Sequence, residues 1–115
     1  MLKQLDSRTP AITIGQGDTA KLLKLSLSDC GRPIDLTGSA VVLRRKLVDS
    51  EAVTLYPMAI TDATNGGVSL SWPANSTDVA GDYQFQIAIT DNQGKVDTHP
   101  KGKYGYELMR ILPAI

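Results

Sequence analysis

Residues 83–90 read YQFQIAIT, and this stretch decides the fold class. Every second residue from Tyr83 to Ile89 is apolar, so one face of an extended strand can be buried. The residues DNQG at 91–94 follow directly and have the composition of a hairpin turn, after which 95–98 lead back along the strand. The pattern predicts a central strand of an antiparallel sheet.

The same alternation recurs along most of the chain, and helical periodicity is almost absent. We expect strands over 11–14, 21–28, 39–48, 53–60, 68–72, 83–90, 95–98 and 104–112. Pro57 cannot donate to a ladder, which places its strand at an edge or across a bulge. The fold class is therefore all-β, an immunoglobulin-like antiparallel sandwich of about seven to eight strands. We expect one domain over residues 1–115, with its structured part at about 10–112.

The apolar faces of these strands define the expected core. Its members are Leu25, Leu43, Leu70, Trp72, Phe85 and Ile87. Arg45 falls on the same nominally buried side of its strand, near the strand's end, where a long side chain is expected to reach water.

Residues 80–83, AGDY, precede the central strand and predict a structural corner. In immunoglobulin-like sandwiches a Tyr at the start of the sixth strand bonds the backbone a few residues upstream. Tyr83 occupies that place, with Gly81 in the turn before it. We assign structural roles to Tyr83, Gly81 and the inward-facing Trp72, and no role in binding.

Composition narrows the classes of partner. Twelve basic residues balance twelve acidic ones among 115, which argues against a general nucleic-acid binder. Residues 1–6, MLKQLD, lack the apolar run of a signal peptide, and no stretch approaches a membrane span of about 20 apolar residues. We expect synthesis in a cytoplasm, no nucleic-acid partner and no membrane partner.

Candidate chemistry is sparse. The single histidine, His99, is expected in a solvated loop, and no nucleophile-elbow motif accompanies it. The single cysteine, Cys30, lies in a turn and cannot form an intrachain disulfide or a structural zinc site alone. Gly15 and Gly17 form a Gly-x-Gly, but a strand follows instead of the helix that a phosphate site requires. We expect no catalytic residue, no metal, no cofactor and no enzymatic activity.

Exposed aromatic residues are the remaining candidates for ligand binding. Trp72 and Tyr83 are expected inside, which leaves Tyr56, Tyr104 and Tyr106 as a binding surface for sugar if they cluster outside. Three basic residues lie near the last two tyrosines, namely Lys101, Lys103 and Arg110. Binding of single-stranded nucleic acid by this group is the weaker interpretation, because the net charge is zero and aromatic residues are few.

Several turn-and-strand motifs resemble a known family. They are QGDT at 16–19, LSLSD at 25–29, GRPIDLTG at 31–38, AVVL at 40–43, DATNGGV at 62–68 and AGDYQF at 80–85. Together they resemble the N-terminal domain of phage baseplate upper proteins, over roughly residues 10–112. The resemblance implies an immunoglobulin-like sandwich that is assembled into a phage or prophage tail or baseplate, without catalytic residues. Its implied partners are other tail or baseplate proteins, or further copies of itself.

Two alternatives stay open at this point. A module that binds carbohydrate or a cell surface would use the exposed tyrosines. An enzyme would need His99 and an acidic partner to line one pocket.

Overall fold

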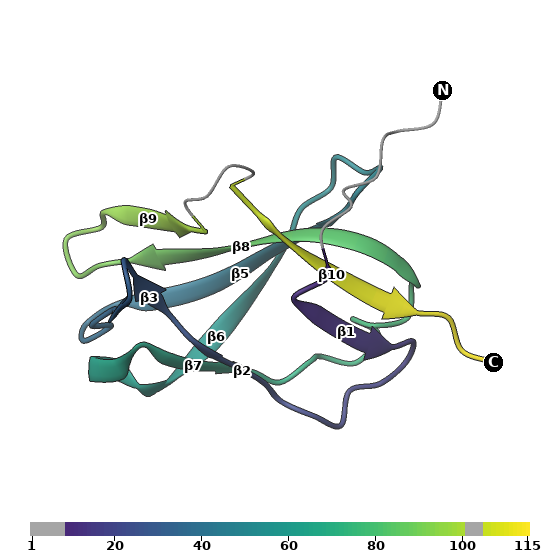
Figure 1. Ribbon diagram of the computed structural model, residues 1–115, viewed down its shortest axis with the longest axis horizontal. Coiled ribbons are helices and arrows are strands. Elements are labelled where there is room, and N and C mark those ends of the chain that lie inside the picture. The colour runs from purple at the N-terminus through teal and green to yellow at the C-terminus, as the bar shows by residue number, and fades with distance from the viewer. Residues whose placement is uncertain (1–8, 101–104) are drawn as a thin grey trace.

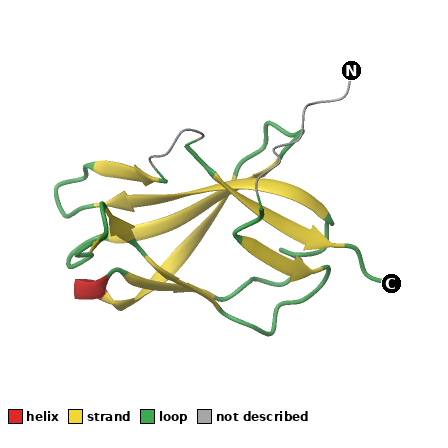
Figure 2. Ribbon diagram, in the orientation of Figure 1, coloured by secondary structure: helices red, strands yellow, loops and turns green. Residues whose placement is uncertain are grey.

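The computed structural model describes residues 9–100 and 105–115, and this part of the chain is almost entirely β-structure (Figures 1 and 2). Its elements are β1 (Ile12–Gly15), β2 (Leu23–Ser26), β3 (Ser28–Asp29), β4 (Arg32–Pro33), β5 (Ala40–Leu47), β6 (Thr54–Asp62), the 3-10 turn η1 (Ala63–Asn65), β7 (Gly67–Leu70), β8 (Gly81–Thr90), β9 (Val96–His99) and β10 (Glu107–Leu112). The expected all-β sandwich is confirmed, with eight strands in one curled sheet and a separate β3–β4 hairpin. No helix in the described ranges is long and apolar enough to cross a membrane.

Strand β8 is central, as its sequence predicts. One side pairs antiparallel with β5 over eight residue pairs, from Ala40↔Thr90 to Leu47↔Tyr83. The other side pairs first with β10 and then with β9. The β8–β9 turn contains Gly94 at φ 80°, a left-handed conformation that glycine adopts without steric cost.

Strand β6 carries the chain from one layer of the sandwich to the other. Residues 54–58 pair with β5, and residues 59–62 pair with β7, with a register shift between Ile60 and Asp62. Pro57 lies in the half that has β5 as its neighbour, opposite Val42. Pro57 therefore lies where β6 pairs with a strand on one side, as at a sheet edge. The register shift comes later in the same strand.

The connected strands run in the order β1, β10, β8, β5, β6, β7, β2, which leaves β1 and β2 at the two ends of the path. β1 pairs parallel with β10, and β2 pairs antiparallel with β7. Because the sheet curls at β6, these end strands flank the open side of the sandwich.

The core lies between the two layers. Its buried members are Ile12, Leu36, Val41, Leu43, Tyr56, Met58, Val68, Leu70, Trp72, Tyr83, Phe85, Ile87, Ile89, Met109 and Ile111. Of the expected core, Leu25 differs because it is only partly buried. It lies on the end strand β2, whose paired neighbour among the described strands is β7.

Candidate interaction surfaces

The corner before β8 is built from a side-chain bond to the backbone. The Tyr83 hydroxyl donates to the Val79 carbonyl at 2.5 Å, and the Tyr83 side chain is buried. Gly81 has φ 145°, which lets the chain turn into β8. Burial raises the pKa of Tyr83 because the phenolate would lose its hydration, and the charge of Arg45 opposes part of this rise.

Arg45 does not reach water, contrary to expectation. The residue is only 7 % exposed, and its guanidinium carbon lies 4.9 Å from the ring centroid of Tyr56, 5.8 Å from that of Trp72 and 4.4 Å from that of Tyr83. Its Nη2 donates to the Ser76 carbonyl at 2.9 Å, whereas Nη1 is buried with no hydrogen-bond partner. The aromatic faces attract the cation, so Arg45 belongs to the core. The alternation of apolar residues along its strand had predicted this inward-facing side correctly.

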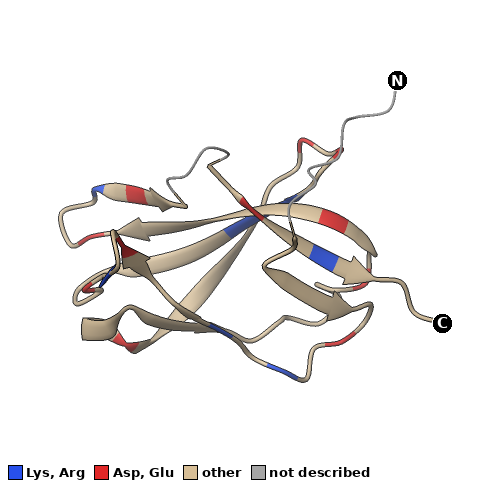
Figure 3. Cartoon of the chain, in the orientation of Figure 1, with Lys and Arg blue, Asp and Glu red and all other residues tan. Residues whose placement is uncertain are grey.

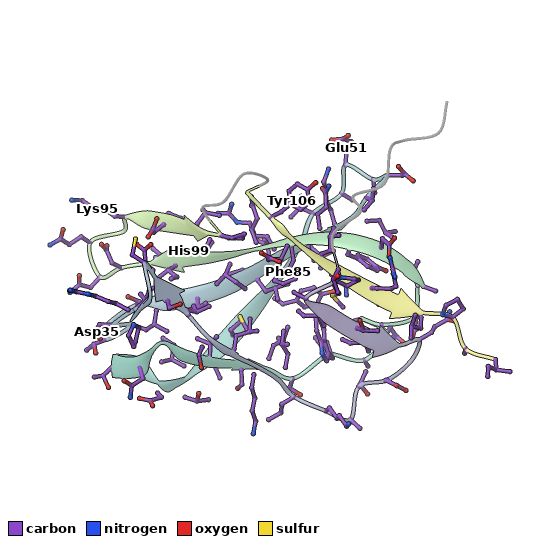
Figure 4. The ribbon with its side chains drawn as sticks, in the orientation of Figure 1. Asp35, Glu51, Phe85, Lys95, His99 and Tyr106 are labelled. Carbon is purple, nitrogen blue, oxygen red and sulfur yellow. The ribbon has the colours of Figure 1, made fainter. Side chains whose placement is uncertain are left out.

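The expected binding surface of three tyrosines is wrong for Tyr56, which is 7 % exposed. Its ring packs edge to face on Trp72, with centroids 5.7 Å apart and planes at 75°. Tyr104 lies outside the described residues, and Tyr106 is half-buried just before β10 (Figure 4). Tyr56 and Met58 face inward, and Pro57 between them faces outward. This alternation in the sequence could have revealed the burial of Tyr56.

Tyr106 borders a groove of about 230 Å³ on the outer face of β5 and β8. Arg44 and Lys46 come from β5, and Gln84 and Gln86 from β8. Gln86 Nε2 donates to the Gly105 carbonyl at 2.7 Å, which ties the segment before β10 to β8. Val53, Phe85 and Tyr106 complete the lining, so the groove combines cations and amides with apolar and aromatic side chains.

Two of the basic candidates near Tyr106, Lys101 and Lys103, lie outside the described residues. The third, Arg110, pairs with Asp82 through an Nε–Oδ1 contact of 2.7 Å. That carboxylate already neutralises the Arg110 charge.

His99 is not a solvated loop residue. It ends β9, is 9 % exposed, and its Nε2 lies 3.0 Å from Asp97 Oδ2 (Figure 4). The antiparallel register places it opposite Ile87, which turns the ring toward the interior. Within the described ranges, the His99 ring bonds a carboxylate and no Ser or Cys nucleophile. The described residues also contain no group of three His, Cys, Asp or Glu side chains that could hold a metal.

Cys30 is exposed at the tip of the β3–β4 hairpin, as its turn predicts. It adopts φ 52°, a left-handed conformation that is unusual for a residue other than glycine.

Within the described residues, β2 is an end strand of the sheet path. β2 is bonded to β7 on one side, and β3 continues it toward the hairpin. We call residues 22–29 the β2 edge. Leu22 at its start is 52 % exposed, and a cavity of about 500 Å³ between β1 and this edge is lined by Ile14, Leu23 and Trp72 among others.

Comparison with known proteins identifies a family and solved structures with a similar fold. The family model of the BppU N-terminal domain, a domain of phage baseplate upper proteins, matches residues 3–100. Among solved structures, CopC from Methylosinus trichosporium OB3b matches with a TM-score of 0.51 at 11 % identity, covering 91 % of this chain and 86 % of that one. At this identity the likeness shows a shared β-fold alone. A search of curated proteins finds no significant match.

Proposed function

Because the chain belongs to the family of BppU N-terminal domains, we propose that it is a non-catalytic assembly module of a phage or prophage tail or baseplate. The observation that carries this proposal is the family match over residues 3–100, nearly the whole chain. The module acts through protein–protein contacts with other tail proteins or with further copies of itself. It is made in the bacterial cytoplasm and assembled into the virion.

The placement of the chemically capable side chains supports a structural role. Arg45, Tyr56 and Tyr83 are used to build the core, and His99 is held by Asp97. The exposed large apolar residues lie instead on edges and loops, where a partner can cover them. They are Leu22, Val53, Leu55, Val79, Val96, Leu112 and Ile115. Exposed apolar residues on strand edges favour contact with other proteins over binding of a small substrate.

The test is to locate the protein in particles. Particles released by the bacterium that encodes the chain are purified, and their protein content is measured by mass spectrometry. Immunogold electron microscopy with an antibody against the chain then shows its position. We expect the chain at fixed stoichiometry in intact particles and gold at the tail end. Its absence from particles of normal morphology would overturn the proposal.

One observation supports sugar binding as a second candidate, namely the outer groove beside Tyr106. Its amides and cations can bond hydroxyl or acidic groups, and the ring can stack on a sugar face. A glycan array with the intact chain tests this, with Tyr106→Ala as the variant that should lose any signal. The burial of Tyr56 removes the larger aromatic surface on which the sequence-based version depended.

A further inference from the structure

The β2 edge is an incomplete part of the sandwich. Leu23, Leu25 and Leu27 face inward but are only partly buried, whereas Val68 and Leu70 on the neighbouring β7 are 1 % and 4 % exposed. The difference arises because β7 has strands on both sides, whereas in residues 9–100 and 105–115 β2 has a neighbouring strand on one side. An added strand beside β2 would complete the burial of these leucines.

The direction of the backbone groups follows from the ladder. The register pairs Leu23 with Leu70 and Leu25 with Val68, and the Leu27 N–H continues it by donating to the Gly66 carbonyl at 2.9 Å. Hydrogen-bonded and non-bonded pairs alternate in an antiparallel ladder. The odd-numbered residues therefore bond to β7, and the N–H and C=O groups of Lys24 and Ser26 point to the open side.

Charge is distributed unevenly along this edge. Lys21 lies immediately before it, Lys24 lies near its beginning, and Asp29 is its last residue, so the colours change from blue to red toward β3 in Figure 3. An edge with opposite charges at its two ends is complementary to a copy of itself that runs in the opposite direction.

We propose that the β2 edge pairs antiparallel with the β2 edge of a second copy, with a two-fold axis at Leu25. In this register Lys24 exchanges backbone hydrogen bonds with Ser26 of the second copy, which uses the outward-pointing groups of both. Lys21 lies opposite Asp29, so unlike charges meet at each end.

The same register joins apolar side chains on the inner face. Leu23 lies opposite Leu27 of the second copy, and the two Leu25 residues face each other as a non-bonded pair, where side chains approach most closely. Exposed Leu22 is covered next to Ser28 of the second copy. A register shifted by one residue would oppose leucines to polar residues and turn bonding groups away from each other.

This inference rests on the proposed role as an assembly module, because it names one partner for that role. The two can fail separately. Particle labelling tests the role, whereas the oligomeric state of the purified chain tests the edge.

The first measurement is light scattering over a concentration series that reaches the high micromolar range. We expect a monomer–dimer equilibrium without larger species, because a two-fold interface closes on itself. A monomer at every concentration overturns the proposal, as does an open-ended series of oligomers.

Engineered cysteines test the register in a Cys30→Ser background. Leu25→Cys places two thiols across the axis at a Cα separation of about 4.5 Å, within reach of a disulfide. Leu22→Cys is the matched control: it is the more exposed site, but the two copies of residue 22 are offset by six residues, or about 20 Å. Under mild oxidation we expect Leu25→Cys to form a covalent dimer and Leu22→Cys to remain monomeric.

A mixture of Leu22→Cys and Ser28→Cys chains provides a second readout that changes no core residue. The register places these two positions opposite each other, so a mixed disulfide should form in preference to either homodimer. Equal crosslinking of all combinations, or efficient crosslinking of Leu22→Cys alone, contradicts the register.

Charge reversal tests the ends of the interface. Lys21→Glu or Asp29→Lys alone should weaken dimerisation roughly 5- to 10-fold, since each dimer contains the pair twice. The double variant should restore affinity, because the charges are exchanged and still opposite. A double variant that is weaker than both single variants would overturn the proposed pairing. Dimers that persist while these variants and crosslinks have no effect would place self-association on another surface.

Discussion

The guanidinium carbon of Arg45 lies 4.4 Å from the centre of the Tyr83 ring, inside the sandwich. Tyr83 in turn bonds the Val79 carbonyl. The corner before β8 and the buried cation therefore share one ring, which connects the loop before β8 to β5.

Arg45→Ala should destabilise the fold by about 2–4 kcal/mol, because it leaves a cavity among three rings and removes the cation–π contacts. Arg45→Lys should cost about 1–2 kcal/mol, since an ammonium cannot stack flat on the rings or keep the Ser76 bond in the same geometry. Urea unfolding measures both. Arg44→Ala, on the outer face of the same strand, is the control and should stay within about 0.5 kcal/mol. A cost for Arg45→Ala as small as that of the control would contradict the role given to the cation.

Tyr83→Phe removes the hydroxyl and keeps the ring. We expect a loss of about 1 kcal/mol in the free energy of unfolding, as for an ordinary intramolecular hydrogen bond. Val79→Ala is the matched control because it changes the side chain of the acceptor residue and leaves its carbonyl in place. If both variants have the stability of the parent chain, the corner bond has no stabilising role.

Alkaline pH should act on the same residue. The pKa of Tyr83 is raised above the ordinary 10.0, mainly because burial disfavours the phenolate. The folded chain thus holds this proton more tightly than the unfolded chain does. The stability that comes from neutral Tyr83 is complete below about pH 10 and is lost as pH rises through the folded-state pKa. Urea midpoints measured from pH 8 to 11 should fall more steeply for the parent than for Tyr83→Phe, and parallel curves would count against a raised pKa.

Leu70→Ala tests the register of the core. Leu70 is 4 % exposed on β7, and its truncation should cost roughly 2–5 kcal/mol through lost burial and a residual cavity. Leu55→Ala removes the same atoms from a side chain that is 59 % exposed on β6, and should cost well under 1 kcal/mol. Similar losses for the two variants would show that the inward and outward faces are misassigned.

The strands were predictable from sequence because alternation is a local property. Residues 83–90 reveal their buried face without knowledge of any neighbour, and the turn at 91–94 reveals the hairpin. The fates of Arg45 and His99 were not predictable in this way. Arg45 depends on rings from other strands and on the carbonyl of Ser76, and His99 depends on its register opposite Ile87 of β8. The open β2 edge was also hidden, because the alternation of residues 23–27 does not show on which side a strand has a neighbour.

Gly66 supports the β2 edge from behind. It has φ 73°, and a Cβ at this position would lie 2.3 Å from the Leu27 carbonyl oxygen, which is backbone and cannot turn away. The Gly66 carbonyl also accepts the hydrogen bond from Leu27 N–H. A side chain here must therefore move either the start of β7 or the end of β2.

Gly94 provides the comparison, because it has a similar φ of 80° and nothing within 4 Å of the added Cβ. Gly94→Ala should cost about 1–2 kcal/mol from the left-handed backbone alone. Gly66→Ala carries the same backbone cost plus the collision, so we expect a total of about 3 kcal/mol or more, a loss that few single substitutions reach. Urea unfolding of the two variants measures the difference. Equal losses would mean that β2 yields freely at Leu27, in which case its open edge would be too compliant to present a fixed ladder to another strand.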